Sequence, residues 1–416
     1  MFFGFKNLMK MKSIIILTIS LTIILALFLL GSFGYLFTTV DNSSTEIPKI
    51  SMIAITEKEL QNQQVRNFKT DNDLVNQILS QCGLDKHCLL EQIQSISKNQ
   101  SEKKLLEIIS LTMGAYDSLG IWCHHQGHHI GEFLLEYYNG DVHLALSNVN
   151  QKCDSSLHHG IIENFLVQQI ILNDVKPQDI QVSNACDIFE DRLINLECAH
   201  GMGHGLVQLS DYDLEWAANR CDEFKILELK QVCYRGVFME NVVSIIDGRG
   251  VYDNNDPYFP CNVLDDRHAQ VCYQYHAGII ATLASENVFD SCDKIEPESL
   301  IKYCYMGVKP FLFNSVFYNN YEPIVETCSE GNLDYQTYCY IGIVIALVDW
   351  RGTEEGITFC KTIPEKFKTD CYDYLGKMIH DEFPDRVEEE CSKAESFEYK
   401  EICKIANPQG LRILIT

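Results

Sequence analysis

The feature that most constrains this chain is a series of cysteine pairs with nearly constant spacing. In seven consecutive pairs the second cysteine follows the first after 11 or 12 residues. These pairs are Cys186 and Cys198, Cys221 and Cys233, Cys261 and Cys272, Cys292 and Cys304, Cys328 and Cys339, Cys360 and Cys371, and Cys391 and Cys403. The second cysteine recurs every 32 to 39 residues, a period typical of helical-hairpin repeats. The chain is therefore expected to be a repeat array.

The residues around the cysteines repeat as well, and they indicate helices. The second cysteine opens a Cys-Tyr-x-Gly sequence at Cys233, Cys304 and Cys339. Apolar runs of helical length follow, such as 237–246, and a shorter amphipathic segment such as 213–221 precedes the first cysteine. Each repeat therefore consists of a short helix, a connection and a longer helix. This predicts an all-α fold of disulfide-stapled helical hairpins, forming an α-solenoid or α/α superhelix.

The N-terminus predicts one membrane-spanning helix. Residues 13–40 carry no charge, and a bilayer core needs about 20 apolar residues. The run is long for a secretory signal peptide and no clean Ala-x-Ala site follows it, which favours an uncleaved signal anchor over a cleaved peptide. Because Lys6, Lys10 and Lys12 precede the run, residues 1–12 are expected to stay in the cytoplasm while the rest is exported.

Export determines how the 18 cysteines are interpreted. Thiols pair in an oxidising extracytoplasmic compartment, whereas the same count in a cytosolic protein would suggest metal clusters. Each disulfide within a repeat would close a short loop and stabilise the fold by on the order of 3 kcal/mol. The expected segments are a cytoplasmic N-terminus 1–12, a signal anchor 13–38, a polar tether 39–70, N-terminal helical repeats 71–185 and cysteine-paired repeats 186–416.

The N-terminal cysteines depart from the repeat spacing. Cys82 and Cys88 are six residues apart, and neither Cys123 nor Cys153 has a partner 11 or 12 residues before it. Cys123 and Cys153 are expected either to pair with each other across stacked helices or to serve as thiolate ligands of a metal. The sequence leaves both alternatives open.

The strong negative charge limits the classes of partner. The formal net charge is −25, and such a field repels the phosphates of nucleic acids while it attracts cations and basic partners. Nucleic acid is therefore not an expected partner. The expected partners are the membrane, through the N-terminal helix, and an envelope protein or glycan held by an acidic array.

Histidines form the one concentration of potential chemistry, since nine of the thirteen lie between residues 124 and 204. Several occupy the second or sixth position after the cysteine that opens their helix: His125, His129, His159, His200 and His204. Residues four apart share a helix face, and equivalent positions of stacked repeats lie side by side. These five side chains are therefore predicted to converge on one groove.

Further ligands are expected near this groove. His128 and His158 share the fifth position of their helices, and Glu132 and Glu163 could add a carboxylate. Imidazole suits zinc, copper and iron, so the predicted cofactor is a transition-metal ion. The alternatives are a buried packing network of histidines and acid–base chemistry without a metal. His-Gly-Met-Gly-His lacks the glutamate of the metalloprotease motif, so we do not assign that activity.

The sequence thus predicts a membrane-anchored extracytoplasmic repeat protein that binds a transition-metal ion through its histidines. The ion would serve catalysis, metal handling or structure. The alternative is a cell-surface scaffold, or a module that binds protein or glycan, with no metal and no catalysis. The later repeats support this alternative, because they keep the cysteines while the histidines become rare.

The predicted topology gives a direct test. A protease added outside intact cells is expected to remove the whole repeat array, because only residues 1–12 should lie in the cytoplasm. Immunoblotting for the C-terminus before and after protease treatment measures this. An array that survives until the cells are lysed would reverse the topology and remove the argument for an oxidising compartment.

Overall fold

The computed structural model describes residues 62–119, 123–149, 155–172, 176, 179–184, 186–190, 192–246, 248–283, 287–308 and 321–407. These residues are predominantly helical, and the one β-type pairing among them is an isolated bridge between Asp253 and Asp256. The predicted all-α class is confirmed. The predicted signal anchor 13–38 lies outside the described residues, and no described helix is long and apolar enough to span a bilayer.

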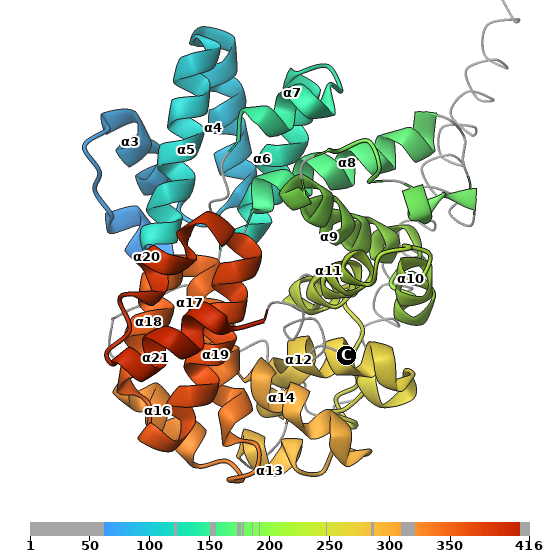
Figure 1. Cartoon of the computed structure of the whole chain (residues 1–416). Coiled ribbons are helices and arrows are strands. Elements are labelled where there is room, and N and C mark those ends of the chain that lie inside the picture. The colour runs from blue at the N-terminus through green and yellow to red at the C-terminus, as the bar shows by residue number, and fades with distance from the viewer. Residues whose placement is uncertain are drawn as a thin grey trace, which may run out of the picture. The chain divides into compact units, whose positions relative to one another are not determined.

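Two kinds of helix alternate along most of the chain (Figure 1). The stack helices are α6 (His124–Tyr137), α8 (Ser156–Leu172), α9 (Arg192–Leu209), α11 (Leu227–Ile246), α12 (Asp266–Leu283), α14 (Ile301–Gly307), α17 (Gln336–Arg351), α19 (Glu365–Glu382) and α21 (Phe397–Ile405). The flanking helices are α7 (Val142–Ser147), α10 (Leu214–Cys221), α13 (Val288–Cys292), α16 (Glu322–Ser329), α18 (Thr353–Thr362) and α20 (Val387–Cys391). Each stack helix packs on the next one in the chain.

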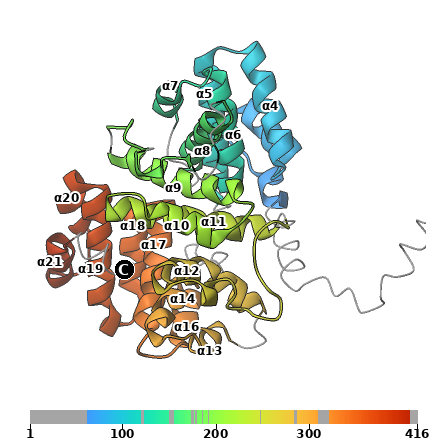
Figure 2. The same cartoon turned by 90° about the vertical axis from the view of Figure 1, so that its right-hand side faces the viewer.

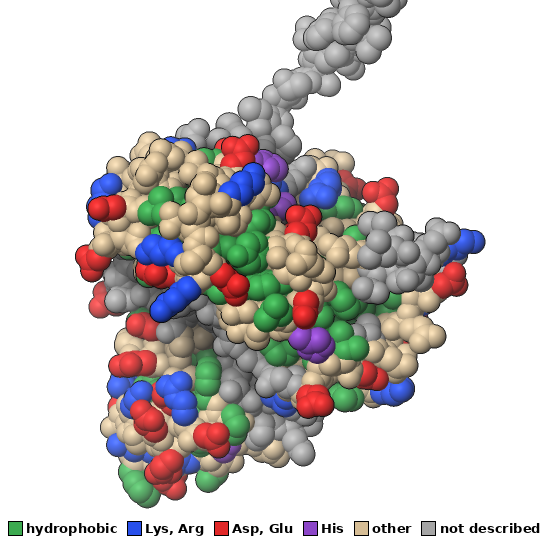
Figure 3. Space-filling model, turned by 90° about the horizontal axis from the view of Figure 1, so that it is seen from above, with side chains coloured by type: hydrophobic (Ala, Val, Ile, Leu, Met, Phe, Trp, Pro, Cys, Tyr) green, Lys and Arg blue, Asp and Glu red, His purple; other side chains and the backbone are tan. Residues whose placement is uncertain are grey.

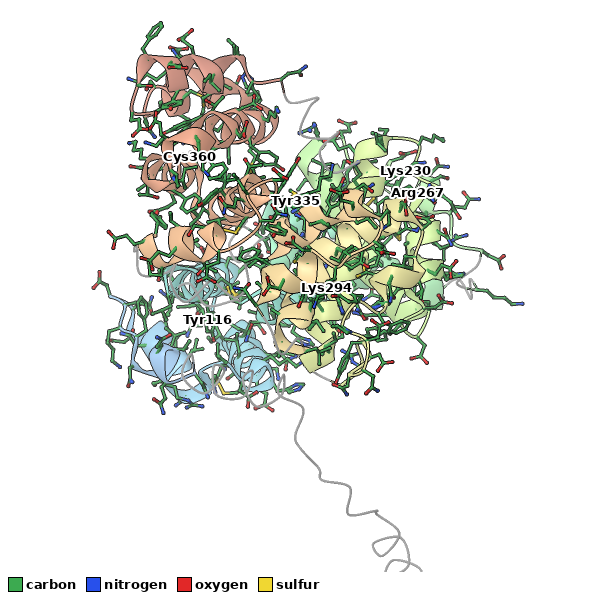
Figure 4. The ribbon with its side chains drawn as sticks, turned by 90° about the horizontal axis from the view of Figure 1, so that it is seen from below. Tyr116, Lys230, Arg267, Lys294, Tyr335 and Cys360 are labelled. Carbon is green, nitrogen blue, oxygen red and sulfur yellow. A yellow bond between two sulfur atoms is a disulfide. The ribbon has the colours of Figure 1, made fainter. Side chains whose placement is uncertain are left out.

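The remaining elements are the N-terminal helices and short 3-10 turns. Helices α3 (Asp73–Cys82), α4 (Lys86–Asn99) and α5 (Glu102–Ser118) precede the stack, and the turns are η2 (Val182–Asn184), η3 (Cys261–Val263), η4 (Glu298–Leu300) and η5 (Pro384–Arg386). Residues 62–67, inside the predicted tether, are also helical. Tyr116, labelled in Figure 4, is buried on α5 and donates a hydrogen bond of 2.6 Å to the carbonyl of Gly83 after α3.

The seven predicted disulfides are confirmed. Cys82 and Cys88 form a further disulfide, and Cys360, labelled in Figure 4, is part of the Cys360–Cys371 pair. The first cysteine ends a flanking helix in α10, α13 and α20, as the pattern predicts. Cys261 instead begins η3, because it follows Pro260, and proline is excluded from the interior of a helix.

The glycine that follows the second cysteine brings neighbouring stack helices into backbone contact. A methyl group added at Gly236, Gly307 or Gly342 would lie 2.1 Å from a carbonyl oxygen of the preceding stack helix. At Gly307 that oxygen belongs to Gln274. Since real side-chain carbons essentially never approach so closely, only glycine permits this packing. Figure 2 shows α9, α11, α12 and α14 following one another in the stack.

The tyrosine of the Cys-Tyr-x-Gly sequence joins the two helices of a hairpin. The hydroxyl of Tyr305 donates to Asp293, the residue after the first cysteine of the pair, at 2.8 Å. Tyr234 makes the equivalent bond to Asp222. These two hairpins are therefore each closed by a disulfide and by a tyrosine–aspartate hydrogen bond next to it, whereas the hydroxyl of Tyr340 donates to the carbonyl of Val325 at 3.4 Å.

The backbone contact predicts the effect of a single methyl group. Gly307→Ala is expected to destabilise the protein by about 1–3 kcal/mol, because overpacking forces the helices apart. Gly114→Ala in α5, where an added methyl meets nothing within 4 Å, should instead stabilise it by up to about 1 kcal/mol through helix propensity. Denaturant unfolding with the disulfides intact measures both changes. Equal stability of the two variants would show that the stack tolerates a wider spacing.

Candidate metal centre

Three histidines from three consecutive stack helices meet in the first part of the stack. They are His128 of α6, His159 of α8 and His204 of α9, and one ring nitrogen of each lies within 4.8 Å of those of the other two. His159 and His204 are buried and His128 is half-buried. Ligands on a tetrahedral zinc ion lie about 3.4 Å apart. Ligand atoms 4.8 Å apart would therefore have to approach each other by about 1.4 Å to share an ion.

Each of these histidines is contacted by a glutamate carboxylate of the next stack helix. Nδ1 of His128 lies 2.8 Å from Glu163 of α8, and Nδ1 of His204 lies 2.9 Å from Glu240 of α11. Nε2 of His159 contacts Glu197 of α9. The site is therefore assembled from four consecutive stack helices. Its three carboxylates follow their histidines in the chain by 35, 38 and 36 residues.

These contacts determine which ring nitrogen faces a ligand. A carboxylate that accepts the proton of one ring nitrogen fixes the tautomer and leaves the other nitrogen to coordinate a metal. If the carboxylates accept from these nitrogens, Nε2 of His128 and of His204 and Nδ1 of His159 would be the nitrogens that could bind a metal. In many metal sites a carboxylate paired in this way with a histidine fixes the orientation of the ring that binds the metal.

A network of hydrogen bonds connects the two outer carboxylates. The side-chain amide of Gln208 donates to Glu163 at 2.7 Å and to Glu240 at 3.2 Å. Ser244 donates to Glu240 at 3.0 Å and shares a bond of 2.7 Å with the hydroxyl of Tyr212. The network couples the orientation of His128 to that of His204, because each ring is held by one of the two carboxylates.

The pKa values of the two carboxylates are shifted in opposite directions. Burial and, to a smaller extent, the charge of Glu240 raise the pKa of Glu163 to about 7. Burial also opposes ionisation of Glu240, but the hydrogen bond and the charge of His204 lower the pKa of Glu240 well below its ordinary value. A cation held by the histidines would favour the ionised form of both groups.

A fourth histidine lies directly beside the three. The ring of His200 stacks on that of His159, with centroids 4.4 Å apart and planes at 22°, and it is 4.9 Å from the ring of His204. Both His200 and His204 project from α9, as expected for residues four apart. His200 does not belong to the group whose ligand atoms lie within 4.8 Å of one another. It forms part of the wall of the site.

The other predicted residues lie in different places. Nδ1 of His129 is 3.8 Å from Glu132, and its ring is 6.2 Å from that of His87. His158 is buried, and burial lowers its pKa to about 4. Helix α6 contains His125, whose side chain is outside the described residues.

Cys123 takes part in a disulfide, so the alternative that it supplies a thiolate is wrong. Cys153, its expected partner, lies outside the described residues. The cluster of histidines is therefore a nitrogen and carboxylate site, and sulfur from Cys123 makes no contribution to its chemistry.

The three close histidines occupy different positions after the cysteines of their helices. His159 and His204 occupy the sixth position, whereas α6 presents His128, at the fifth. The packing of α6 on α8 sets this position, because a methyl group at Gly160 would lie only 2.2 Å from the carbonyl oxygen of His128. The sequence reasoning missed Glu197 and Gln208. An acidic residue 35 to 38 positions after each histidine was the available signal.

No protein-family model, curated protein or solved structure matches this chain. The chemistry of the site therefore has to be inferred from its own geometry. Three imidazole nitrogens with carboxylate partners suit zinc, copper or iron. With three protein ligands, one position of a tetrahedral ion stays available for water or a substrate.

Proposed function

We propose that the protein binds a divalent transition-metal ion through His128, His159 and His204. The observation that carries the proposal is that each of these rings is held by a carboxylate from the following helix. Histidines that only pack need hydrogen bonds, but packing does not require three imidazoles, each held by a carboxylate, to meet at one point. Their ligand atoms lie within 4.8 Å of one another, which favours a shared ion.

Zinc is the first candidate for this ion, with copper and iron as alternatives. Zinc accepts three histidines and keeps a fourth position for water in catalytic sites. The carboxylates beside the ligands add negative charge, which favours a divalent cation over a neutral or monovalent ligand. Water on such an ion becomes acidic enough to act as a nucleophile near neutral pH. A metal-dependent reaction is therefore one use of the site, beside metal handling.

The cellular setting is part of the proposal. The many disulfides support an oxidising, extracytoplasmic compartment. We propose that residues 13–38 anchor the chain in the membrane, and that the packed series of stack helices is an α-solenoid exposed on the outer side.

A second candidate function is a scaffold or a module that binds an envelope protein or glycan. The observation in its favour is that the metal centre occupies only α6, α8, α9 and α11. From α12 to α21 the stack helices pack on one another and carry disulfides in the same way. The described residues of these helices contain no further group of close histidines. These later repeats would supply the binding surface whether or not the first ones hold an ion.

Removal of one ligand tests the proposal. His204→Ala is expected to lower zinc affinity by at least about a hundredfold, because two remaining histidines cannot hold the ion tightly. His143→Ala, an exposed histidine on α7, is the matched control and should bind as the wild type does. Elemental analysis after dialysis measures retention, and far-ultraviolet dichroism checks the fold. Wild-type protein that retains no metal would leave the scaffold as the better function.

The carboxylate partners give a second, graded test. Glu240→Gln keeps the shape of the side chain but removes its charge, and zinc affinity is expected to fall by about 10- to 100-fold. Glu215→Gln, an exposed position on the neighbouring helix α10, should have no effect. Competition with a chromophoric chelator measures the affinity. If both variants match the wild type, Glu240 has no part in supporting the ligand.

A further inference from the structure

We propose a second site for a divalent transition-metal ion, formed at the surface by His87 of α4 and by His129 and Glu132 of α6. The buried centre uses none of these three residues. His129 and Glu132 lie one helical turn apart on α6, and His87 faces them from the start of α4. The proposal is independent of the buried centre and does not require that centre to hold an ion.

The spacing between His129 and Glu132 fits a shared ion better than a direct bond. Nδ1 of His129 is 3.8 Å from the nearest carboxylate oxygen of Glu132. A hydrogen bond between such groups would be about 2.7–3.2 Å long. Two ligand atoms on a tetrahedral ion are about 3.4 Å apart, since each bond is about 2.1 Å. A small movement of either side chain therefore reaches the coordination distance.

The two imidazoles need only a small approach to share an ion. The ring centroids of His87 and His129 are 6.2 Å apart. An ion lies about 3.2 Å from the centroid of a ring that binds it, so two rings on one tetrahedral ion have centroids about 5.2 Å apart and these rings would have to approach by about an ångström. His87 is exposed and has room to rotate towards the ion.

The backbone beneath His87 is held firmly. The disulfide between Cys82 and Cys88 joins the end of α3 to the first turn of α4. The side chain of Asp85 caps α4 by accepting from the amide nitrogens of His87, at 3.0 Å, and Cys88, at 3.1 Å. Because α4 packs directly on α6, the three ligands project from two fixed helices. Such a site loses little conformational freedom when an ion binds.

Exposure distinguishes this site from the buried one. The side chains of His129 and Glu132 are 30% and 45% exposed, whereas that of His204 is 1% exposed. Histidine atoms reach the surface beside acidic side chains on the face drawn in Figure 3. An ion at the surface keeps water ligands, so it should bind more weakly and exchange faster than an ion at His128, His159 and His204.

Zinc titration of the full-length protein tests the inference. Calorimetry with Zn²⁺ alone is expected to resolve two ions per chain in the wild type, one tight and one weak. His87→Ala should remove the weak ion and leave the tight one, and His204→Ala should do the reverse. His87 is exposed on α4, so its replacement should not disturb α6. His143→Ala is the matched control and should keep both ions.

The outcomes separate this site from the buried centre. A single ion that survives His87→Ala and is lost in His204→Ala would overturn the surface site and leave the buried one intact. A single ion with the opposite response would support the surface site and remove the buried one. If two ions remain in His87→Ala, and also in Glu132→Gln, the weak ion binds elsewhere and the surface site is wrong.

Discussion

The close backbone contact between consecutive stack helices is the constraint on which the rest of the structure depends. At Gly160 and Gly236 an added methyl would lie 2.1–2.2 Å from the carbonyl oxygen of a histidine on the preceding helix, His128 and His200 respectively. A larger residue would separate the helices and turn them about their axes. The positions of His128 and His200 around their helices are therefore fixed by a glycine of the next stack helix.

This close packing explains why the candidate metal centre crosses so many repeats. In every case the histidine and its carboxylate belong to consecutive stack helices, as with His204 of α9 and Glu240 of α11. A bond of 2.9 Å between such side chains requires helices that approach closely and keep their register. The same contact that builds the array therefore also orients the ligands, and one repeat alone could not form the site.

Much of the fold and part of the site could be predicted from the sequence. The spacing of the cysteines gave the disulfides and the order of the helices, because both depend on residues close in the chain. His128, His159, His204 and Glu163 were all among the residues expected at the cluster. The sequence could not show that His128 rather than His129 lies beside His159 and His204, because a rotation of one residue about α6 depends on its packing against Gly160. Glu197 was missed because its partner, His159, lies 38 residues away on another helix, so their contact depends on how the helices pack.

The disulfides also bear on what a bound ion would do. Cys198 in α9 and Cys233 in α11 are each bonded within their own hairpin, and Cys123 at the start of α6 is bonded as well. Each such bond contributes on the order of 3 kcal/mol without any metal. Zinc-finger domains lack this support and fold only when the ion binds. Here α6, α9 and α11, which carry His128, His204 and Glu240, are held independently of the ion. Binding therefore has little to add to folding, and an ion with one open position is better suited to exchange or chemistry than to structural support.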